Sequence, residues 1–133
     1  MFTYKTSIRL HQTDAAGLLF FAQQFALAHD AYETFVESIG FSFDHAIRSS
    51  EFLLPIVHAE ADYKIPMRVG DKITVTMRLA QIGTTSFVLD YELSNASGAT
   101  VGTVKTVHVW TDRATMQKTM LPDWLKAALK QLS

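Results

Sequence analysis

The sequence predicts an α+β fold in which an antiparallel five-stranded sheet wraps around one long central helix. Three observations predict it. Polar and apolar residues alternate in five segments, as in strands, and after the first of these segments apolar residues recur with the 3.6-residue period of a helix. The connections between the later strand segments are short and contain glycine. Connections that short join antiparallel neighbours, because a parallel crossover needs a dozen residues or more. A helix of about 19 residues also needs a broad apolar surface, which a curved sheet provides.

The first predicted strand is followed by the central helix. One face of the strand carries Phe2, Tyr4, Thr6, Ile8 and Leu10. In the helix, an apolar stripe at steps of four and three residues consists of Phe21, Phe25, Ala28, Tyr32, Phe35 and Ile39. Asp30, Glu33 and Glu37 lie on another face, and Gly40 is predicted to end the helix at its C′ position.

The remaining elements follow in order. Residues 41–51 form either a short second helix or a structured loop, and strands are predicted at 54–65, 72–82, 86–94 and 100–111. Pro122 and Asp123 open a final helix that covers 124–132. Neither a linker nor a repeat divides the chain, so we expect one domain over residues 1–133.

Composition excludes several classes of function. Twelve Lys and Arg against 13 Asp and Glu, without a basic cluster, argue against nucleic acid as a partner. The absence of cysteine excludes disulfides, thiolate metal sites and a cysteine nucleophile. No signal-peptide layout and no apolar run of about 20 residues is present, so we expect a cytoplasmic protein without a membrane partner.

The stretch HQTDAAGLLF places one carboxylate, Asp14, just before the central helix. An aspartate there often caps the helix or closes an Asx-turn, and Gly17 provides an unusual backbone angle. An aspartate is ionised at neutral pH, and free N–H groups at a helix N-terminus can stabilise an oxyanion that develops during a reaction. The structural and the chemical role are compatible with each other.

Two longer stretches resemble a known family. TDAAGLLFFAQQFALAHDAYETF (residues 13–35) and LPIVHAEADYKIPMRVGD (54–71) are similar to hotdog-fold thioesterases of the 4-hydroxybenzoyl-CoA thioesterase type, and within them most similar to 1,4-dihydroxy-2-naphthoyl-CoA hydrolases. The resemblance implies a hotdog fold and a homodimer or homotetramer with active sites at the seam between subunits. It also implies that Asp14 is catalytic, that Gly17 forms the turn, and that the backbone N–H of Phe21 is the oxyanion donor.

The implied activity is hydrolysis of an aromatic acyl-CoA, with 1,4-dihydroxy-2-naphthoyl-CoA of menaquinone or phylloquinone biosynthesis as the best candidate. Because the coenzyme A thiolate is a good leaving group, one carboxylate and one oxyanion donor can suffice. Asp14 either attacks directly or draws a proton from water, and the sequence leaves both routes open. No cofactor or metal is expected, since coenzyme A is part of the substrate.

Further residues are candidates for substrate binding. His58 and Phe20 are candidates for contacts with the acyl group, and Lys64 and Arg68 for contacts with the phosphates of coenzyme A. His58 also alternates with two carboxylates, Glu60 and Asp62, which suggests either a metal site or, as we favour, a solvated or interface strand face.

Other candidates are weaker. A related branch of the family uses a helix carboxylate, which makes Glu33 a second catalytic candidate, although its position fits an exposed or intersubunit helix face better. His29 flanks the aromatic stripe and is most simply a helix-packing residue. No serine lies in a Gly-x-Ser-x-Gly elbow, which argues against a serine hydrolase.

Two other functions stay open at this point, and a third is disfavoured. The first is a broader thioesterase for short or medium aliphatic acyl-CoA or for acyl-carrier protein. The second is a non-catalytic hotdog module that binds acyl-CoA, against which the complete turn from Asp14 to Gly17 argues. The third, hydration chemistry, is disfavoured because no histidine follows Asp14 before His29.

Overall fold

The computed structural model describes residues 1–49 and 51–133. In chain order the elements are β1 (Phe2–Ser7), a 3-10 turn η1 (Leu10–Gln12), α1 (Gln23–Ser38), α2 (Phe43–Ser49), β2 (Phe52–Leu53), β3 (Ile56–Tyr63), β4 (Lys72–Ile82), β5 (Ser86–Ser94), β6 (Thr100–Val109), β7 (Thr111–Asp112) and α3 (Asp123–Lys130). The predicted α+β fold with its five-stranded antiparallel sheet is confirmed.

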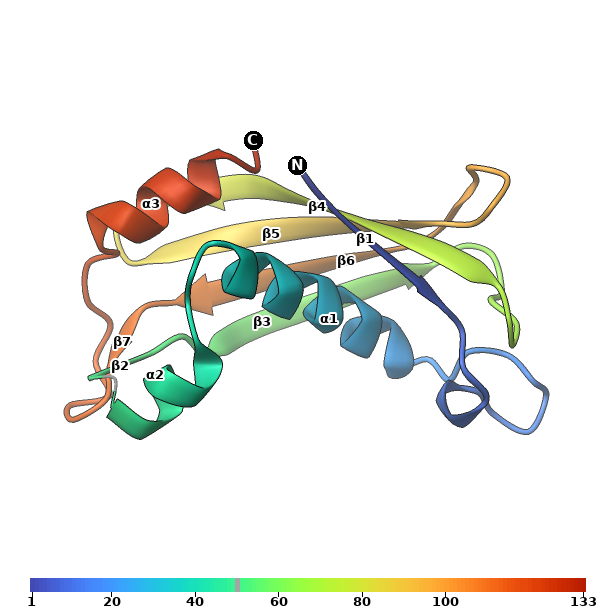
Figure 1. The fold of residues 1–133 in the computed structure, drawn as a ribbon, viewed down its shortest axis with the longest axis horizontal. Coiled ribbons are helices and arrows are strands. Elements are labelled where there is room, and N and C mark those ends of the chain that lie inside the picture. The colour runs from blue at the N-terminus through green and yellow to red at the C-terminus, as the bar shows by residue number, and fades with distance from the viewer. Residues whose placement is uncertain (50) are drawn as a thin grey trace.

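The main sheet has the strand order β1-β4-β5-β6-β3, and every neighbouring pair is antiparallel. The long helix α1 crosses one face of this sheet, while β2 and β7 form a separate two-stranded ribbon beside α2 (Figure 1). Because β3 is the last strand in the order, one of its edges has no partner within the sheet. The candidate site lies next to the end of this edge strand.

The core lies between α1 and the inner face of the sheet. The predicted inner faces of β4 and β5 are confirmed, since their side chains are buried except for the half-buried Leu79: Ile73, Val75, Met77, Phe87, Leu89, Tyr91 and Leu93. The buried face of α1 consists of Gln24, Leu27, Ala28, Ala31, Tyr32, Phe35 and Val36. This face includes a fully buried glutamine, which the predicted apolar stripe does not contain.

The start of the central helix differs from the prediction. Helix α1 has 16 residues and begins at Gln23, so Phe21 lies outside it, with 63% of its surface exposed. Tertiary hydrogen bonds explain the later start: the Phe20 N–H donates to Gln12 O (2.9 Å), and the Tyr63 hydroxyl donates to Phe21 O (2.7 Å). These contacts hold residues 20 and 21 in a turn that leads into the helix.

The end of α1 agrees with the prediction. Gly40 has a φ of 86°, its N–H donates to Glu37 O (3.0 Å), and the Phe41 N–H donates to Val36 O (3.3 Å). These two bonds form a Schellman motif with glycine at C′, where its left-handed backbone costs least.

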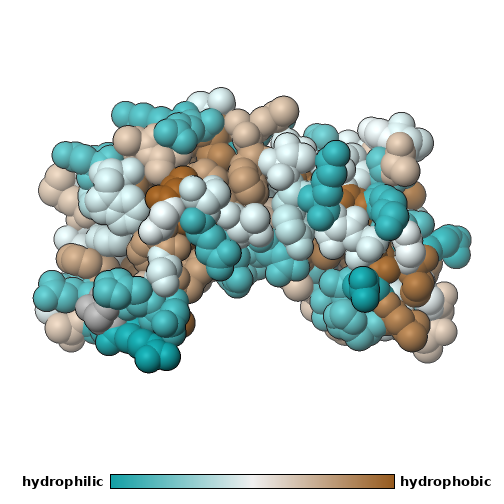
Figure 2. All heavy atoms as spheres, viewed as in Figure 1, coloured by the Kyte–Doolittle hydropathy of each residue, from teal (hydrophilic) through white to brown (hydrophobic). Residues whose placement is uncertain are grey.

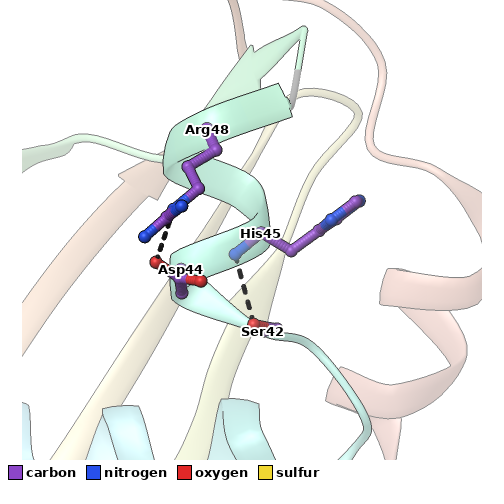
Figure 3. A network of polar contacts seen from close by, with 4 residues as sticks. All are labelled: Ser42, Asp44, His45 and Arg48. Carbon is purple, nitrogen blue, oxygen red and sulfur yellow. Dashed lines mark hydrogen bonds and ion pairs between the residues drawn. The ribbon is translucent and has the colours of Figure 1, made fainter.

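After α1, the segment predicted as helix or loop contains α2. The side chain of Ser42 accepts a hydrogen bond from the His45 N–H (3.2 Å) at the start of α2, and Arg48 pairs with Asp44 (2.9 Å) across one turn (Figure 3). The helical alternative is therefore confirmed for this segment, of which Ser50 lies outside the described residues.

Strand limits follow the predictions closely where turns are local. The bounds of β4 and β5 agree with those predicted. β1 is shorter than predicted, because the Ile8 N–H bonds to Asp71 O (2.9 Å) and the chain then turns into η1, leaving Leu10 exposed. Among the described residues no helix is long and apolar enough to cross a membrane.

Candidate active site

The loop before α1 is built around the side chain of Asp14. Its Oδ1 accepts hydrogen bonds from the N–H groups of Ala16 (2.9 Å) and Leu18 (3.3 Å), and the Asp14 N–H donates to Leu18 O (2.9 Å). Gly17 completes this Asx-turn with a φ of 76°. Asp14 thus closes a turn and does not cap α1, whose N-cap position is Ala22.

One oxygen of Asp14 stays available. The hydrogen bonds of the turn use Oδ1, and within the described part of the chain no donor bonds to Oδ2. The side chain is exposed rather than packed against other groups. The sequence is compatible with a structural role for Asp14 in the turn and with a chemical role in catalysis. The geometry is compatible with both, because the turn uses Oδ1 and the proposed chemistry needs Oδ2.

The Asp14 loop is fixed against the segment that follows β3. The Leu19 N–H donates to Met67 O (2.8 Å), and Leu18 forms a β-bridge with Arg68. These backbone contacts hold the carboxylate beside residues more than 50 positions away in the sequence. The loop therefore has a defined place relative to the edge strand β3.

Phe21 presents a backbone N–H that lacks an acceptor among the described residues. Its own carbonyl accepts the hydrogen bond from Tyr63, the last residue of β3, so the position of the residue is fixed from the sheet. Helix α1 begins two residues later without a side-chain cap and without an acidic residue in its first turn. A free amide donor at the positive end of a helix dipole is suited to an oxyanion.

A cleft of about 350 Å³ joins these groups. Asp14, Phe21 and Lys64 all line it, together with Gln24 and Tyr63. The volume lies at the lower end of the range typical of small-molecule sites. Residues that carry a carboxylate, a free amide donor and an ammonium group therefore line one cavity.

The other predicted residues lie elsewhere in this chain. The Phe20 ring packs on Phe21 (4.8 Å between centroids) without lining the cleft. Arg68 is not among the residues that line the cleft; its backbone bridges to Leu18, and its N–H donates to Asp71 Oδ2 (2.8 Å). His58 pairs with the outward-facing Val107 on β6, and its ring lies 3.7 Å from Glu60, so it faces away from α1.

The predicted solvated strand face and helix face can now be located. Glu60 and Asp62 line a hollow on the outer face of the sheet, and His29 pairs with Glu33 (3.0 Å) on the exposed side of α1. In the described ranges, no group of three or more His, Cys, Asp or Glu side chains is close enough to hold a metal ion.

Gln24 and Tyr63 are two site residues that sequence reasoning missed. The Gln24 side chain is fully buried, and its Nε2 donates to the carbonyls of Asp62 (3.0 Å) and Thr103 (3.1 Å), which ties the first turn of α1 to β3 and β6. A glutamine within an otherwise apolar helix face is the signal that could have indicated such a contact. For Tyr63, the signal is its place two residues after Ala61 on the inward-facing side of β3.

A protein-family model described as the thioesterase-like superfamily matches residues 8–129. The chain belongs to this superfamily. A 1,4-dihydroxy-2-naphthoyl-CoA hydrolase of Rippkaea orientalis is 36% identical over 130 residues, covering 93% of this chain and 94% of that protein. The corresponding protein of Synechococcus elongatus is 34% identical, with coverage of 94% and 95%.

Solved structures agree with the family assignment. The crystal structure of a 1,4-dihydroxy-2-naphthoyl-CoA thioesterase from Synechocystis superposes with a TM-score of 0.92 and 33% identity, covering 98% of this thioesterase-like chain and 96% of the other. The comparisons confirm the family recognised in the sequence, the hotdog fold and the class of enzyme, a thioester hydrolase.

Proposed function

We propose that this protein hydrolyses 1,4-dihydroxy-2-naphthoyl-CoA to the free acid and coenzyme A, a reaction of menaquinone or phylloquinone biosynthesis. The observation that carries the proposal is that one cleft is lined both by Asp14, whose Oδ2 is available, and by Phe21, whose N–H has no acceptor among the described residues. The similarity to hydrolases and to a thioesterase named for this substrate supports the choice of acyl group. The cytoplasmic location expected from the sequence belongs to the same proposal.

In this mechanism the thioester carbonyl oxygen accepts a hydrogen bond from the Phe21 N–H. Asp14 takes a proton from a water molecule, whose oxygen adds to the carbonyl carbon, and the oxyanion then collapses and breaks the C–S bond. Coenzyme A leaves as a thiolate. In the alternative route Oδ2 itself adds to the carbon, and water hydrolyses the resulting mixed anhydride. Loss of one oxyanion donor costs about 10²–10³ in turnover in other acyl-transfer enzymes.

Lys64 and Arg68 are the proposed contacts for the phosphates of coenzyme A. Lys64 lines the cleft, and Arg68 follows the lining residue Met67 in the segment bridged to the Asp14 loop. Phe20, exposed next to Phe21, is a proposed contact for a part of the acyl-CoA that extends outside the cleft. His58 can meet an acyl group only if a second subunit brings one to the outer side of β3.

A homodimer through β3 is part of the proposal. β3 is an eight-residue edge strand with exposed apolar residues, including Ile56 (40% exposed) and Val57 (60%), and such an edge readily pairs with another strand. The surface is also hollowed below α1, between the lobe with α2 and the lobe with residues 10–22 (Figure 2). Antiparallel pairing of two β3 strands would bring the Ile56 end of one strand next to the Tyr63 end of the other.

The decisive experiment replaces Asp14 by asparagine. This substitution keeps an oxygen that can accept from Ala16 and Leu18, so the turn is preserved while the charge is removed. We expect kcat on 1,4-dihydroxy-2-naphthoyl-CoA to fall at least about a hundredfold with binding retained. The matched control is Asp123→Asn, an exposed carboxylate at the start of α3, which should leave kcat unchanged. Equal rates for Asp14→Asn and wild type would refute the assignment.

A panel of acyl-CoA thioesters, followed by release of free thiol, tests the acyl group separately. A marked preference for straight aliphatic chains would favour the broader thioesterase that the sequence left open. Binding of every thioester without turnover by wild type would instead favour the non-catalytic module.

A further inference from the structure

A second cavity lies farther along the same side of α1. Its volume is about 300 Å³, and it is lined by Phe25, Ala26 and His29 of α1, Ile56 and Ala59 of β3, Tyr91 of β5 and Thr106 of β6. We call it the α1–β3 groove. Gln24 of the cleft directly precedes Phe25 in α1, and Tyr63 of the cleft lies on the same strand as Ala59, so the groove and the cleft are neighbours along one helix and one strand.

Small side chains on the edge strand keep the groove open. Ala59 pairs with Thr106 and Ala61 pairs with Val104 on the inner face of the sheet, where β4 and β5 carry large residues. Two alanines leave unfilled space between α1 and the sheet. Apart from His29, the walls formed by α1 and β3 are apolar and include the aromatic ring of Phe25, which suits a flat aromatic group.

The floor of the groove carries a chain of polar groups. The hydroxyls of Tyr91 and Thr106 lie 3.2 Å apart, and Thr106 Oγ1 lies 2.8 Å from His108 Nε2. All three side chains are buried: Tyr91 is 3% exposed, Thr106 6% and His108 0%. The His108 ring is held between Phe87 (4.9 Å) and Tyr32 (4.7 Å), so it cannot turn freely.

The hydroxyl of Thr106 can make one more hydrogen bond than the two it makes in this structure. A threonine hydroxyl offers one donor and two acceptor positions, and the contacts with Tyr91 and His108 use two of the three. Burying polar groups in an apolar core is unfavourable unless their hydrogen bonds are made. A ligand group that bonds to the third position of Thr106 would therefore be recognised strongly.

We propose that the α1–β3 groove receives the aromatic ring of the acyl group, and that Thr106 hydrogen-bonds a ring hydroxyl remote from the thioester. Thr106 is then a specificity-determining residue, and Tyr91 and His108 are positioning residues that fix its hydroxyl. This inference rests on the proposed function and extends it from the reacting carbonyl to the recognition of the ring. Apolar walls alone discriminate weakly between rings, whereas a buried polar partner rejects a ring that lacks the hydroxyl.

The test compares two thioesters that differ in one group. 1,4-Dihydroxy-2-naphthoyl-CoA carries the remote hydroxyl, and 1-hydroxy-2-naphthoyl-CoA lacks it. We expect wild type to prefer the first by tenfold or more in kcat/KM. Thr106→Val should bring this ratio close to one through a loss on the dihydroxy substrate, while Thr106→Ser, which retains the hydroxyl, should keep the preference.

Two results would overturn the inference. The first is a wild-type enzyme that does not distinguish the two thioesters, and the second is a Thr106→Val variant that slows both by the same factor, as a merely structural network would. If Thr106→Val does not fold, Tyr91→Phe serves in its place and should reduce the same ratio. An unchanged ratio in that variant would also contradict the proposal.

Failure of the proposed function is recognised separately. If wild type hydrolyses neither thioester, binding of the free acids, 1,4-dihydroxy-2-naphthoate and 1-hydroxy-2-naphthoate, is measured by calorimetry. Tighter binding of the dihydroxy acid, lost in Thr106→Val, would support the groove without any turnover. Equal affinity of wild type for both acids would overturn the groove as well.

Discussion

The hydroxyl of Tyr63 donates a 2.7 Å hydrogen bond to the carbonyl oxygen of Phe21. The two residues are 42 positions apart in the sequence, yet this bond connects the end of the edge strand β3 to Phe21, which lines the cleft. The proposed oxyanion donor is thus positioned by the sheet as well as by the start of α1.

Tyr63→Phe removes this hydrogen bond and keeps the ring. The net value of such a bond is about 1 kcal/mol, so we expect kcat to fall about fivefold to tenfold as the Phe21 N–H loses its fixed position. KM should change less than about twofold, because the acyl and coenzyme A contacts remain. Tyr4→Phe, on β1, is the control and should behave as wild type in steady-state kinetics. A Tyr63→Phe enzyme with unchanged kcat would show that the bond does not position the donor.

Gly17→Ala tests the turn that presents Asp14. At a φ of 76° a side chain costs about 1–2 kcal/mol, so the variant should unfold at lower urea concentration and lose activity as the Asx-turn opens. Gly83→Ala is the matched control, because a Cβ there would meet its nearest atoms at ordinary distances of 3.5 and 3.6 Å. Equal urea midpoints for the two variants would contradict this account of the turn.

Gly102→Ala tests the contact between β6 and the buried amide of Gln24. A Cβ at residue 102 would lie 2.6–2.8 Å from the amide atoms of Gln24, which two hydrogen bonds hold in place. We expect a loss of about 1–3 kcal/mol in the free energy of unfolding. In a Gln24→Ala background the same substitution should cost much less, because the clash is gone. Additive losses in the double-mutant cycle would exclude this steric cause.

His108 should make stability depend on pH. Burial, with a smaller contribution from His29, lowers the pKa of His108 from 6.5 to about 4. Between these pH values the unfolded chain binds a proton at this residue that the folded protein excludes. The contribution of neutral His108 to the free energy of unfolding is therefore fully present above pH 6.5 and is lost as the pH falls toward 4. The slope from this group is about 1.4 kcal/mol per pH unit.

Urea unfolding measured between pH 5 and 6.5 checks this prediction. His108→Leu removes the titrating group and should flatten the slope in that window, whatever its effect on overall stability. His11→Gln, at an exposed histidine, should leave the slope as in wild type. An unchanged slope in His108→Leu would mean that another group causes the dependence.

Local patterns in the sequence determined much of this structure. The limits of β4 and β5, the end of α1 at Gly40 and the turn from Asp14 to Gly17 depend on alternation, on short breaks and on glycines at left-handed positions. All of these signals lie within a few residues of the structure that they specify. The family resemblance rests on the same kind of contiguous motif, which is why the sequence alone indicates it.

Contacts between distant segments decided the rest. The start of α1 at Gln23 depends on the hydrogen bond from Tyr63, and the burial of Gln24 depends on carbonyls of β3 and β6 that lie 38 and 79 residues away. Thr106 reaches the α1–β3 groove only because β6 pairs with β3, and the register shift between Ile56 and His58 turns His58 to the outer face. A one-dimensional pattern specifies which residues are apolar, whereas the partner of each buried polar group is fixed only when the sheet closes around the helix.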